Sequence, residues 1–220
     1  MLASELSTHF PRLFHMTYPE SWEGIRNGGL ISVSSLLTCF EIEGPERHAL
    51  EGARRAARAT LTSPRHGVAV LRDNGPISDS KLAACLDDGI TTDEWYRILN
   101  ARSFFWLTSK RVETLLSAKA YRDEDHVVIV VDTAALVAKH HAAIELSPIN
   151  SGATVFKAQR RGRDTFQSIA AYDFASWKKK RGTAGAIAEL TVKEGVPDLM
   201  EFVVEVERRN AAGLRQVIWP

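Results

Sequence analysis

Cysteine and long apolar runs are scarce in this chain, and each scarcity restricts what the protein can be. Cys39 and Cys85 are the two cysteines among 220 residues, and they form no CxxC pair. We therefore expect both to be small apolar residues of a reducing compartment. No apolar stretch approaches the roughly 20 residues of a membrane helix, and Met1–His9 lacks the basic and apolar segments of a secretory signal. These absences predict a cytoplasmic protein that has no membrane partner.

The motifs of several common enzyme classes are absent as well. The sequence contains no GxGxxG, P-loop, HExxH or GxSxG, which argues against Rossmann-type dinucleotide binding and P-loop phosphoryl transfer. His140 and His141 are adjacent, so they cannot share one face of a regular element, and no cysteine or carboxylate lies at ligand spacing from them. We therefore expect no metal site.

The composition is ordinary for a soluble globular protein, with 45% hydrophobic and 25% charged residues. No segment demands to be a linker, so we treat residues 1–220 as a single domain. The net charge is +1, but residues 157–181 contain eight basic and two acidic side chains, a local charge of +6, and Arg54, Arg55 and Arg58 form a second basic cluster. Such an excess suits a ligand that carries phosphate. The alternative is a pair of solvated faces balanced by acids elsewhere.

Apolar and β-branched runs predict the strands. The clearest is His126–Val131, whose apolar character throughout indicates burial on both faces. The other expected strands are residues 13–17, 68–71, 103–107, 144–146, 154–156, 188–192 and 202–206.

Capping and periodicity predict the helices. Thr17 with Glu20 and Thr91 with Glu94 have capping-box spacing, and Gly28–Gly29 stops the first of these two helices. Further helices are expected over residues 32–40, where irregular structure is the alternative, and over residues 48–61, 80–86, 108–116 and 132–140. Residues 157–181 have little periodicity and predict a long loop with one helical turn near Trp177. The fold class is therefore α+β, with helices mostly early and strands mostly late.

Three features carry chemistry. His15 lies in an expected strand, Phe104–Trp106 form an aromatic strand followed by Lys110 and Arg111, and Glu189 is a carboxylate inside an apolar strand. A buried carboxylate is costly unless it faces a cleft or finds a partner. The alternatives are a His15 at the edge of the core, hydrogen-bonded to a backbone carbonyl, and a Glu189 that faces water from an edge strand.

In this order the segments resemble a single-domain ADP-ribosyltransferase, and within that superfamily the DarT group, whose known members modify bases in single-stranded DNA. The resemblance is carried by Leu13–Thr17 through Gly29–Leu30, by Phe104–Trp106 with Arg111, and by Ala188–Val192 with Val196–Pro197. Residues 85–100 also resemble an uncharacterised bacterial family placed near this group. Residues 47–100 match no part of the DNA-modifying members, and we interpret residues 43–100 as a helical, insertion-like segment.

The resemblance implies split antiparallel β-sheets with peripheral helices, and a mono-ADP-ribosyltransferase that uses NAD as co-substrate and releases nicotinamide. It implies catalytic roles for Glu189 and Arg111, with Lys110 and Arg102 as alternatives to Arg111. NAD would contact His15, Thr17, Gly29, Leu30, Phe105 and Trp106. A nucleic-acid acceptor, single-stranded and DNA rather than RNA, would contact Arg160, Arg161, Arg163, Lys178 and Lys179.

The resemblance leaves the acceptor and the biological role open. A protein acceptor and chemistry like that of RNA 2′-phosphotransferases are rivals within the superfamily. A non-catalytic nucleic-acid-binding module is the rival from another class. A role as a toxin or in phage defence, with an antitoxin or immunity protein as partner, is implied by the resemblance alone.

Overall fold

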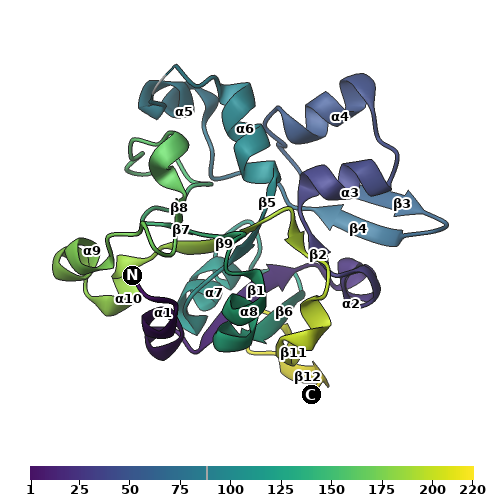
Figure 1. Cartoon of the computed structure of the whole chain (residues 1–220). Coiled ribbons are helices and arrows are strands. Elements are labelled where there is room, and N and C mark those ends of the chain that lie inside the picture. The colour runs from purple at the N-terminus through teal and green to yellow at the C-terminus, as the bar shows by residue number, and fades with distance from the viewer. Residues whose placement is uncertain (88) are drawn as a thin grey trace.

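The computed structural model describes residues 1–87 and 89–220 as a mixture of helices and small antiparallel sheets (Figure 1). The first four-stranded sheet has the order β1 (Arg12–Thr17), β6 (His126–Asp132), β11 (Val203–Arg209), β12 (Arg215–Trp219). The second has the order β5 (Arg102–Phe105), β9 (Glu189–Lys193), β7 (Ile144–Ser147), β8 (Gln167–Ser168). Two-stranded sheets pair β10 (Gly195–Val196) with β2 (Leu30–Ile31), and β3 (Ala59–Ser63) with β4 (Gly67–Leu71).

The two larger sheets meet where β1 passes the end of β5. Phe14 and Trp106 exchange two backbone hydrogen bonds, with N···O distances of 2.9 and 2.8 Å. Because neighbouring residues of a strand point to opposite faces, this bridge places His15 next to the aromatic strand β5. The carboxyl-terminal half of β1 therefore runs beside residues of the second sheet.

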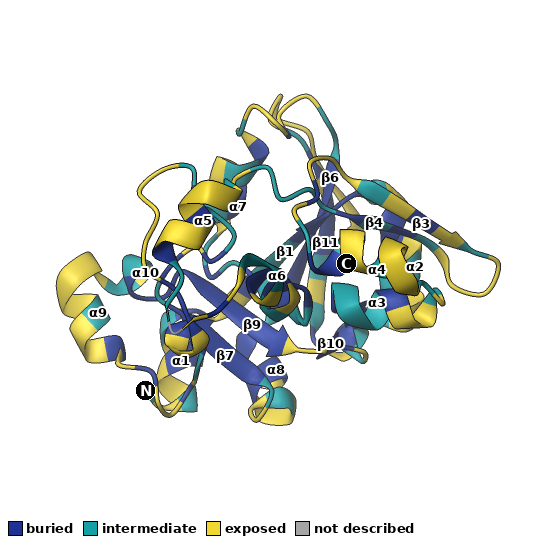
Figure 2. Cartoon of the chain, turned by 90° about the horizontal axis from the view of Figure 1, so that it is seen from above, coloured by how far each residue is buried: buried dark blue, intermediate teal, exposed yellow. Residues whose placement is uncertain are grey.

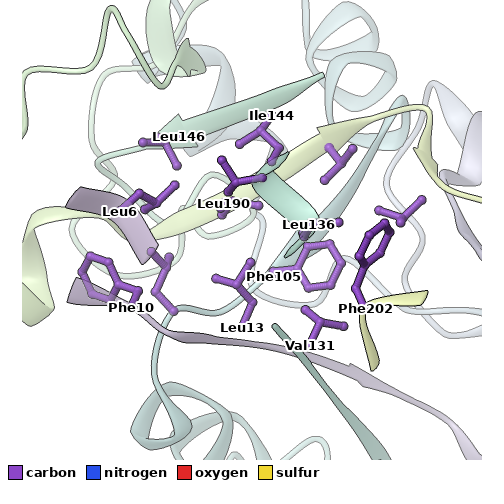
Figure 3. Packing of buried hydrophobic residues seen from close by; sticks show 14 of the residues in the cluster. Leu6, Phe10, Leu13, Phe105, Val131, Leu136, Ile144, Leu146, Leu190 and Phe202 are labelled. Carbon is purple, nitrogen blue, oxygen red and sulfur yellow. The ribbon is translucent and has the colours of Figure 1, made fainter. Parts of the chain in front are cut away.

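The core is built around β6, as the apolar run predicted. All residues of β6 are buried except Asp132. Val127, Ile129 and Val131 pack into the main core, and Val128 packs on the other face against a cluster that includes Met16. Figure 3 shows side chains of the main core coming from both large sheets, with Val131 beside Phe105 in this view. Burial on both faces of β6 is confirmed.

Several predicted helix ends are confirmed. α6 (Thr92–Asn100) begins with the Thr91–Glu94 capping box, and Asp132 caps α8 (Thr133–His140) by accepting from the Ala135 amide. α2 (Trp22–Gly28) ends at Gly29, whose φ is +80°. A Cβ at this position would lie 2.3 Å from the carbonyl oxygen of Pro197, so both the backbone angle and the close approach require glycine.

The helix predicted over residues 48–61 is wrong. α4 (Gly44–Glu51) starts at Gly44–Pro45, because proline is tolerated in a first helical turn, and ends before Gly52. Residues 59–63 form β3 instead. Thr60 and Thr62 are exposed while Leu61 is buried, and this two-residue alternation with β-branched residues favours a strand paired with β4.

Other predictions also need correction. Thr17 does not cap a helix, because it is the last residue of β1, and the turn η1 (Pro19–Ser21) leads into α2. No strand forms at residues 154–156. Residues 157–181 are not a long loop, since they hold η2 (Arg163–Thr165), β8 and α9 (Phe174–Arg181). Helices and strands are interleaved along the chain rather than segregated, and residues 43–100 contain the β3–β4 hairpin as well as helices.

The remaining elements are peripheral. They are α1 (Ala3–His9), α3 (Val33–Cys39), α5 (Asp79–Cys85), α7 (Ser109–Leu116), α10 (Thr183–Ala186) and η3 (Leu199–Glu201). Figure 2 shows that α9 is largely exposed, whereas β7 and β9 are buried. Within residues 1–87 and 89–220, no helix has the length and apolar character needed to span a bilayer.

Candidate active site

His15 and Glu189 line the same cleft, which has a volume of about 320 Å³. His15 comes from β1 of one large sheet and Glu189 from β9 of the other. Thr17, Leu30 and Trp106 also line this cleft. The volume lies within the usual range of ligand pockets, about 300–1,000 Å³. Residues that are far apart in the sequence thus converge on one cleft.

Glu189 is a buried carboxylate with a specific partner. It is 3% exposed, and its Oε2 accepts hydrogen bonds from the Ser151 amide at 3.1 Å and the Ser151 hydroxyl at 2.6 Å. The idea of a water-facing acid on an edge strand is wrong, because β9 lies between β5 and β7. Burial raises the pKa of Glu189 to about 7, although Ser151 and the charges of Arg111 and Arg161 oppose this shift. The carboxyl group can therefore exchange a proton near neutral pH.

Arg161 holds the turn that supports Glu189. Its guanidinium donates to the carbonyl oxygens of Ser151 at 2.7 Å, Ala153 at 3.1 Å and Gln159 at 3.0 Å, and the residue is only 2% exposed. The expectation that Arg161 contacts nucleic acid is therefore wrong, since its donors are occupied by backbone carbonyls. Sequence composition could not separate it from the exposed arginines beside it.

His15 lines the cleft and is also hydrogen-bonded to a backbone carbonyl, so both interpretations of its sequence position apply. Its Nδ1 lies 2.9 Å from the carbonyl oxygen of Phe104. Because a carbonyl can only accept, Nδ1 carries the proton, which leaves Nε2 as an acceptor. Burial lowers the pKa of His15 to about 4, with a smaller contribution from the charge of Arg72. The imidazole is thus neutral near pH 7 and can accept a hydrogen bond from a hydroxyl group.

The aromatic strand is divided between the cleft and the core. Phe104 and Trp106 line the cleft, whereas Phe105 is 1% exposed and packs in the main core (Figure 3). The predicted contact of Phe105 with NAD needs correction, because alternation along β5 turns it to the opposite face. Its ring instead supports His15 edge-on, with centroids 6.0 Å apart. Gly29 is likewise a turn residue packed on Pro197 rather than part of the cleft lining described by the structure.

Among the three basic candidates, Arg111 is the one whose charge acts on Glu189. Arg102 lines the cleft, unlike Arg111, but its guanidinium is already paired with Glu145 at 2.8 Å and donates to the Ile98 carbonyl. Lys110 is exposed. Burial lowers the pKa of Arg111, and Glu189 raises it.

The other predicted acceptor contacts lie on the surface. Arg160 forms an ion pair with Asp87, and Arg163 lies 4.0 Å from Glu94. Lys178 and Lys179 are exposed on α9. In Figures 1 and 2, α9 lies on the side of the molecule away from the β3–β4 hairpin. None of these four cations belongs to the cleft lining that the structure describes.

Several cleft residues of the insertion-like segment and its surroundings had no role predicted from the sequence. They include Tyr18, Arg72, Asn100 and Tyr121. Arg55, from the second basic cluster that the sequence marked as suited to phosphate, also lines the cleft. Residues 43–100 carry no motif, and only the packing of the β3–β4 hairpin against η1 and α2 brings this segment to the cleft. The cleft is thus completed by the part of the chain that the resemblance does not cover.

A protein-family model described as a family of unknown function, DUF7002, matches residues 11–203. The chain belongs to the DUF7002 family. No curated protein matches it. The part of the chain that matches DUF7002 contains His15, Arg111, Ser151, Arg161 and Glu189, and it ends before most of β11 and the whole of β12.

The buried carboxyl of this DUF7002 protein predicts a pH-dependent stability. Burial raises the pKa of Glu189 from its usual 4.5 to about 7. The folded chain therefore binds the proton of Glu189 more tightly than the unfolded chain does. The protonated side chain stabilises the folded state fully below pH 4.5, the pKa in the unfolded chain, and this contribution is lost as pH rises through about 7, the pKa in the folded chain. We expect the unfolding free energy of Glu189→Gln, relative to wild type, to increase by about 3 kcal/mol between about pH 4 and about pH 8. Urea denaturation at both pH values measures this.

The matched control is Glu46→Gln, which replaces an exposed carboxylate of α4. Comparing the free-energy difference between variant and wild type at the two pH values cancels any pH-independent effect of replacing the carboxyl group by an amide. A difference that stays constant with pH contradicts the raised pKa of Glu189.

Proposed function

We propose that the protein is an NAD-dependent mono-ADP-ribosyltransferase that transfers ADP-ribose to a nucleic-acid base and releases nicotinamide. The observation that carries this proposal is the convergence of His15 and Glu189 on one cleft from two different sheets. The resemblance of the sequence to ADP-ribosyltransferases supplies the reaction class. The geometry supports the proposal with a neutral hydrogen-bond acceptor, His15, and a titratable carboxylate, Glu189, in one cleft.

The cleft residues suit cleavage of the bond between ribose and nicotinamide. That cleavage passes through an oxocarbenium-like state, as in glycoside hydrolysis. The electron pair of the C1′–N bond leaves with nicotinamide, and the carboxylate of Glu189 stabilises the positive charge that develops on the ribose. As the base nitrogen bonds to C1′, its proton passes to Glu189, whose pKa of about 7 suits that transfer.

His15 and Trp106 line the cleft and can orient the dinucleotide, whereas Arg111 acts on Glu189 from outside the described lining. The Nε2 atom of His15 accepts a hydrogen bond from a ribose hydroxyl, because Nδ1 is already committed to the Phe104 carbonyl. Trp106 provides an aromatic face for nicotinamide. The charge of Arg111 favours the ionised form of Glu189 and thereby keeps a carboxylate available at neutral pH.

A nucleic-acid acceptor is favoured by exposed cations that lie outside the cleft lining, where a strand longer than the cleft would meet them. Arg163, Lys178 and Lys179 are exposed and can neutralise backbone phosphates. Such contacts are independent of sequence and guide a strand without selecting a base. Base selection is then left to the cleft.

The proposal is tested by mass spectrometry of the products. The protein is incubated with NAD and, separately, with single-stranded DNA oligonucleotides, RNA oligonucleotides and a protein pool. We expect one ADP-ribosyl unit to be added to a base of the DNA, together with release of nicotinamide. Modification of protein alone would assign the rival acceptor within the superfamily. Salt-sensitive DNA binding without saturable NAD binding would instead identify a non-catalytic module.

A further inference from the structure

Arg72 lies in the cleft between two tyrosine rings. Its guanidinium carbon is 5.4 Å from the ring centroid of Tyr18 and 4.8 Å from that of Tyr121. One guanidinium nitrogen, Nη2, donates to the Met16 carbonyl at 3.0 Å. The other, Nη1, is buried and has no hydrogen-bond partner among the residues that the structure describes. Tyr18, Arg72 and Tyr121 all line the cleft.

The backbone at Arg72 is held by the buried side chain of Arg55. Arg55 is 8% exposed and donates through Nε to the Arg72 carbonyl at 2.9 Å and through Nη1 to Asn100 at 3.1 Å. The Tyr121 hydroxyl donates to Asp73 at 3.0 Å. Arg72 follows directly after β4. These bonds hold the backbone at Arg72, while the Met16 carbonyl and the two tyrosine rings hold its guanidinium. This order before any ligand arrives lowers the entropic cost of binding.

The surroundings of Arg72 are positively charged. Burial lowers the pKa of Arg55 to about 10, which still leaves it charged at neutral pH. Arg58 stacks on Tyr18 at 5.0 Å, so the rings and guanidinium groups alternate in the order Arg58, Tyr18, Arg72, Tyr121. Asp73 offsets part of this charge, and so does Glu124, which forms an ion pair with Arg58 at 3.0 Å. An anionic group in this part of the cleft would be attracted by Arg72 and Arg55, whose charges act across a low-dielectric, largely buried lining.

An unpaired guanidinium N–H is costly to bury, because it loses water without gaining an acceptor. Native proteins pair nearly all such groups, and an exception calls for a physical reason such as a bound ligand. Planar guanidinium groups that stack on aromatic rings are well suited to phosphate oxygens. We propose that Arg72, between Tyr18 and Tyr121, is a phosphate-binding subsite that the insertion-like segment contributes to the cleft. The subsite rests on the proposed function for the source of its phosphate, which is either the dinucleotide or the acceptor strand.

Calorimetric titration tests this subsite without requiring turnover. The probes are ADP-ribose, which carries a pyrophosphate, and a short single-stranded DNA oligonucleotide, which carries phosphodiesters. Arg72→Gln is expected to weaken binding of one probe by about tenfold or more, as loss of a charge-assisted hydrogen bond predicts. Loss of ADP-ribose binding assigns the pyrophosphate, and loss of oligonucleotide binding assigns the acceptor strand. Arg26→Gln, which removes an exposed arginine paired with Glu23, should change neither by more than about twofold.

Arg72→Lys is a second variant for the case in which Arg72→Gln does not fold. Lysine keeps the positive charge but lacks the planar guanidinium with its paired donors. We expect it to weaken the same probe to an intermediate extent, and it decides the question if the glutamine variant does not fold by circular dichroism. Equal binding of both probes by wild type and these variants overturns the subsite, and so does the absence of saturable binding of either probe to wild type. A wild-type protein that shows Arg72-dependent binding but releases no nicotinamide keeps the subsite and contradicts the transferase.

Discussion

Replacing Glu189 by Gln is expected to reduce nicotinamide release from NAD by about 10²–10⁴-fold, because the amide can neither carry the negative charge nor accept the proton. Glutamine has nearly the same shape and keeps an oxygen for the Ser151 hydroxyl. The loss should therefore appear in the rate and not in folding. Nicotinamide release measured by chromatography under initial-rate conditions gives the ratio directly.

The wild-type pH profile provides the second readout for Glu189. Because the reactive form is the carboxylate, kcat/KM should rise with pH and level off above a pKa of about 7. His15, whose pKa is lowered to about 4, stays neutral across this range and adds no second inflection there. A Glu189→Gln variant that retains full turnover would remove Glu189 from the chemistry and with it the proposed reaction.

Replacing Arg161 by Met is expected to lower the free energy of unfolding by about 3–5 kcal/mol, because three carbonyl oxygens lose their donor in a buried setting. Urea denaturation monitored by circular dichroism measures the change. Arg163→Met is the matched control, since it removes an exposed arginine two positions along the chain. A loss below about 1 kcal/mol would contradict the inferred role of Arg161 in holding the turn.

A milder substitution at the same position separates positioning from stability. Arg161→Lys keeps the positive charge, but its donors all lie on one nitrogen, so it cannot reproduce the three bonds that Nε, Nη1 and Nη2 make to separate carbonyls. Ser151 then holds Glu189 less firmly, and because the bonds from Ser151 lower the pKa of Glu189, that pKa should rise. The expected result is a pH profile shifted toward higher pH in the folded variant. An unshifted profile would show that the turn stabilises the fold without acting on Glu189.

Local features of the sequence predicted much of the fold. The Thr91–Glu94 capping box, the Asp132 cap and the uninterrupted apolar run of β6 involve residues within a few positions of one another. Such short-range interactions are visible without a tertiary structure. The prediction over residues 48–61 was wrong for the opposite reason. Leu61 fits a helical spacing, but pairing of β3 with β4 and burial of Leu61 against Leu71 outweigh that weak preference.

The candidate site was predicted in part. Sequence patterns placed His15 and Glu189 on separate strands, and the structure brings both to one cleft. The sequence did not show which face of β5 is turned toward the cleft. Phe105 was therefore assigned to the cleft, whereas Phe104 and Trp106 line it. A run of three aromatic residues has no alternation of polarity from which to choose the buried face.

The sequence by itself determined the element types around His15, the aromatic strand and Glu189, because hydrophobic periodicity and capping act over a few residues. Only the tertiary structure decided which charged side chains serve the site. Arg161 and Arg163 are indistinguishable in composition, yet one is clamped by backbone carbonyls and the other is exposed. Arg72 joins the cleft through the packing of a hairpin that no motif marks. These distinctions depend on burial and on partners many residues away, which is information that only the folded chain contains.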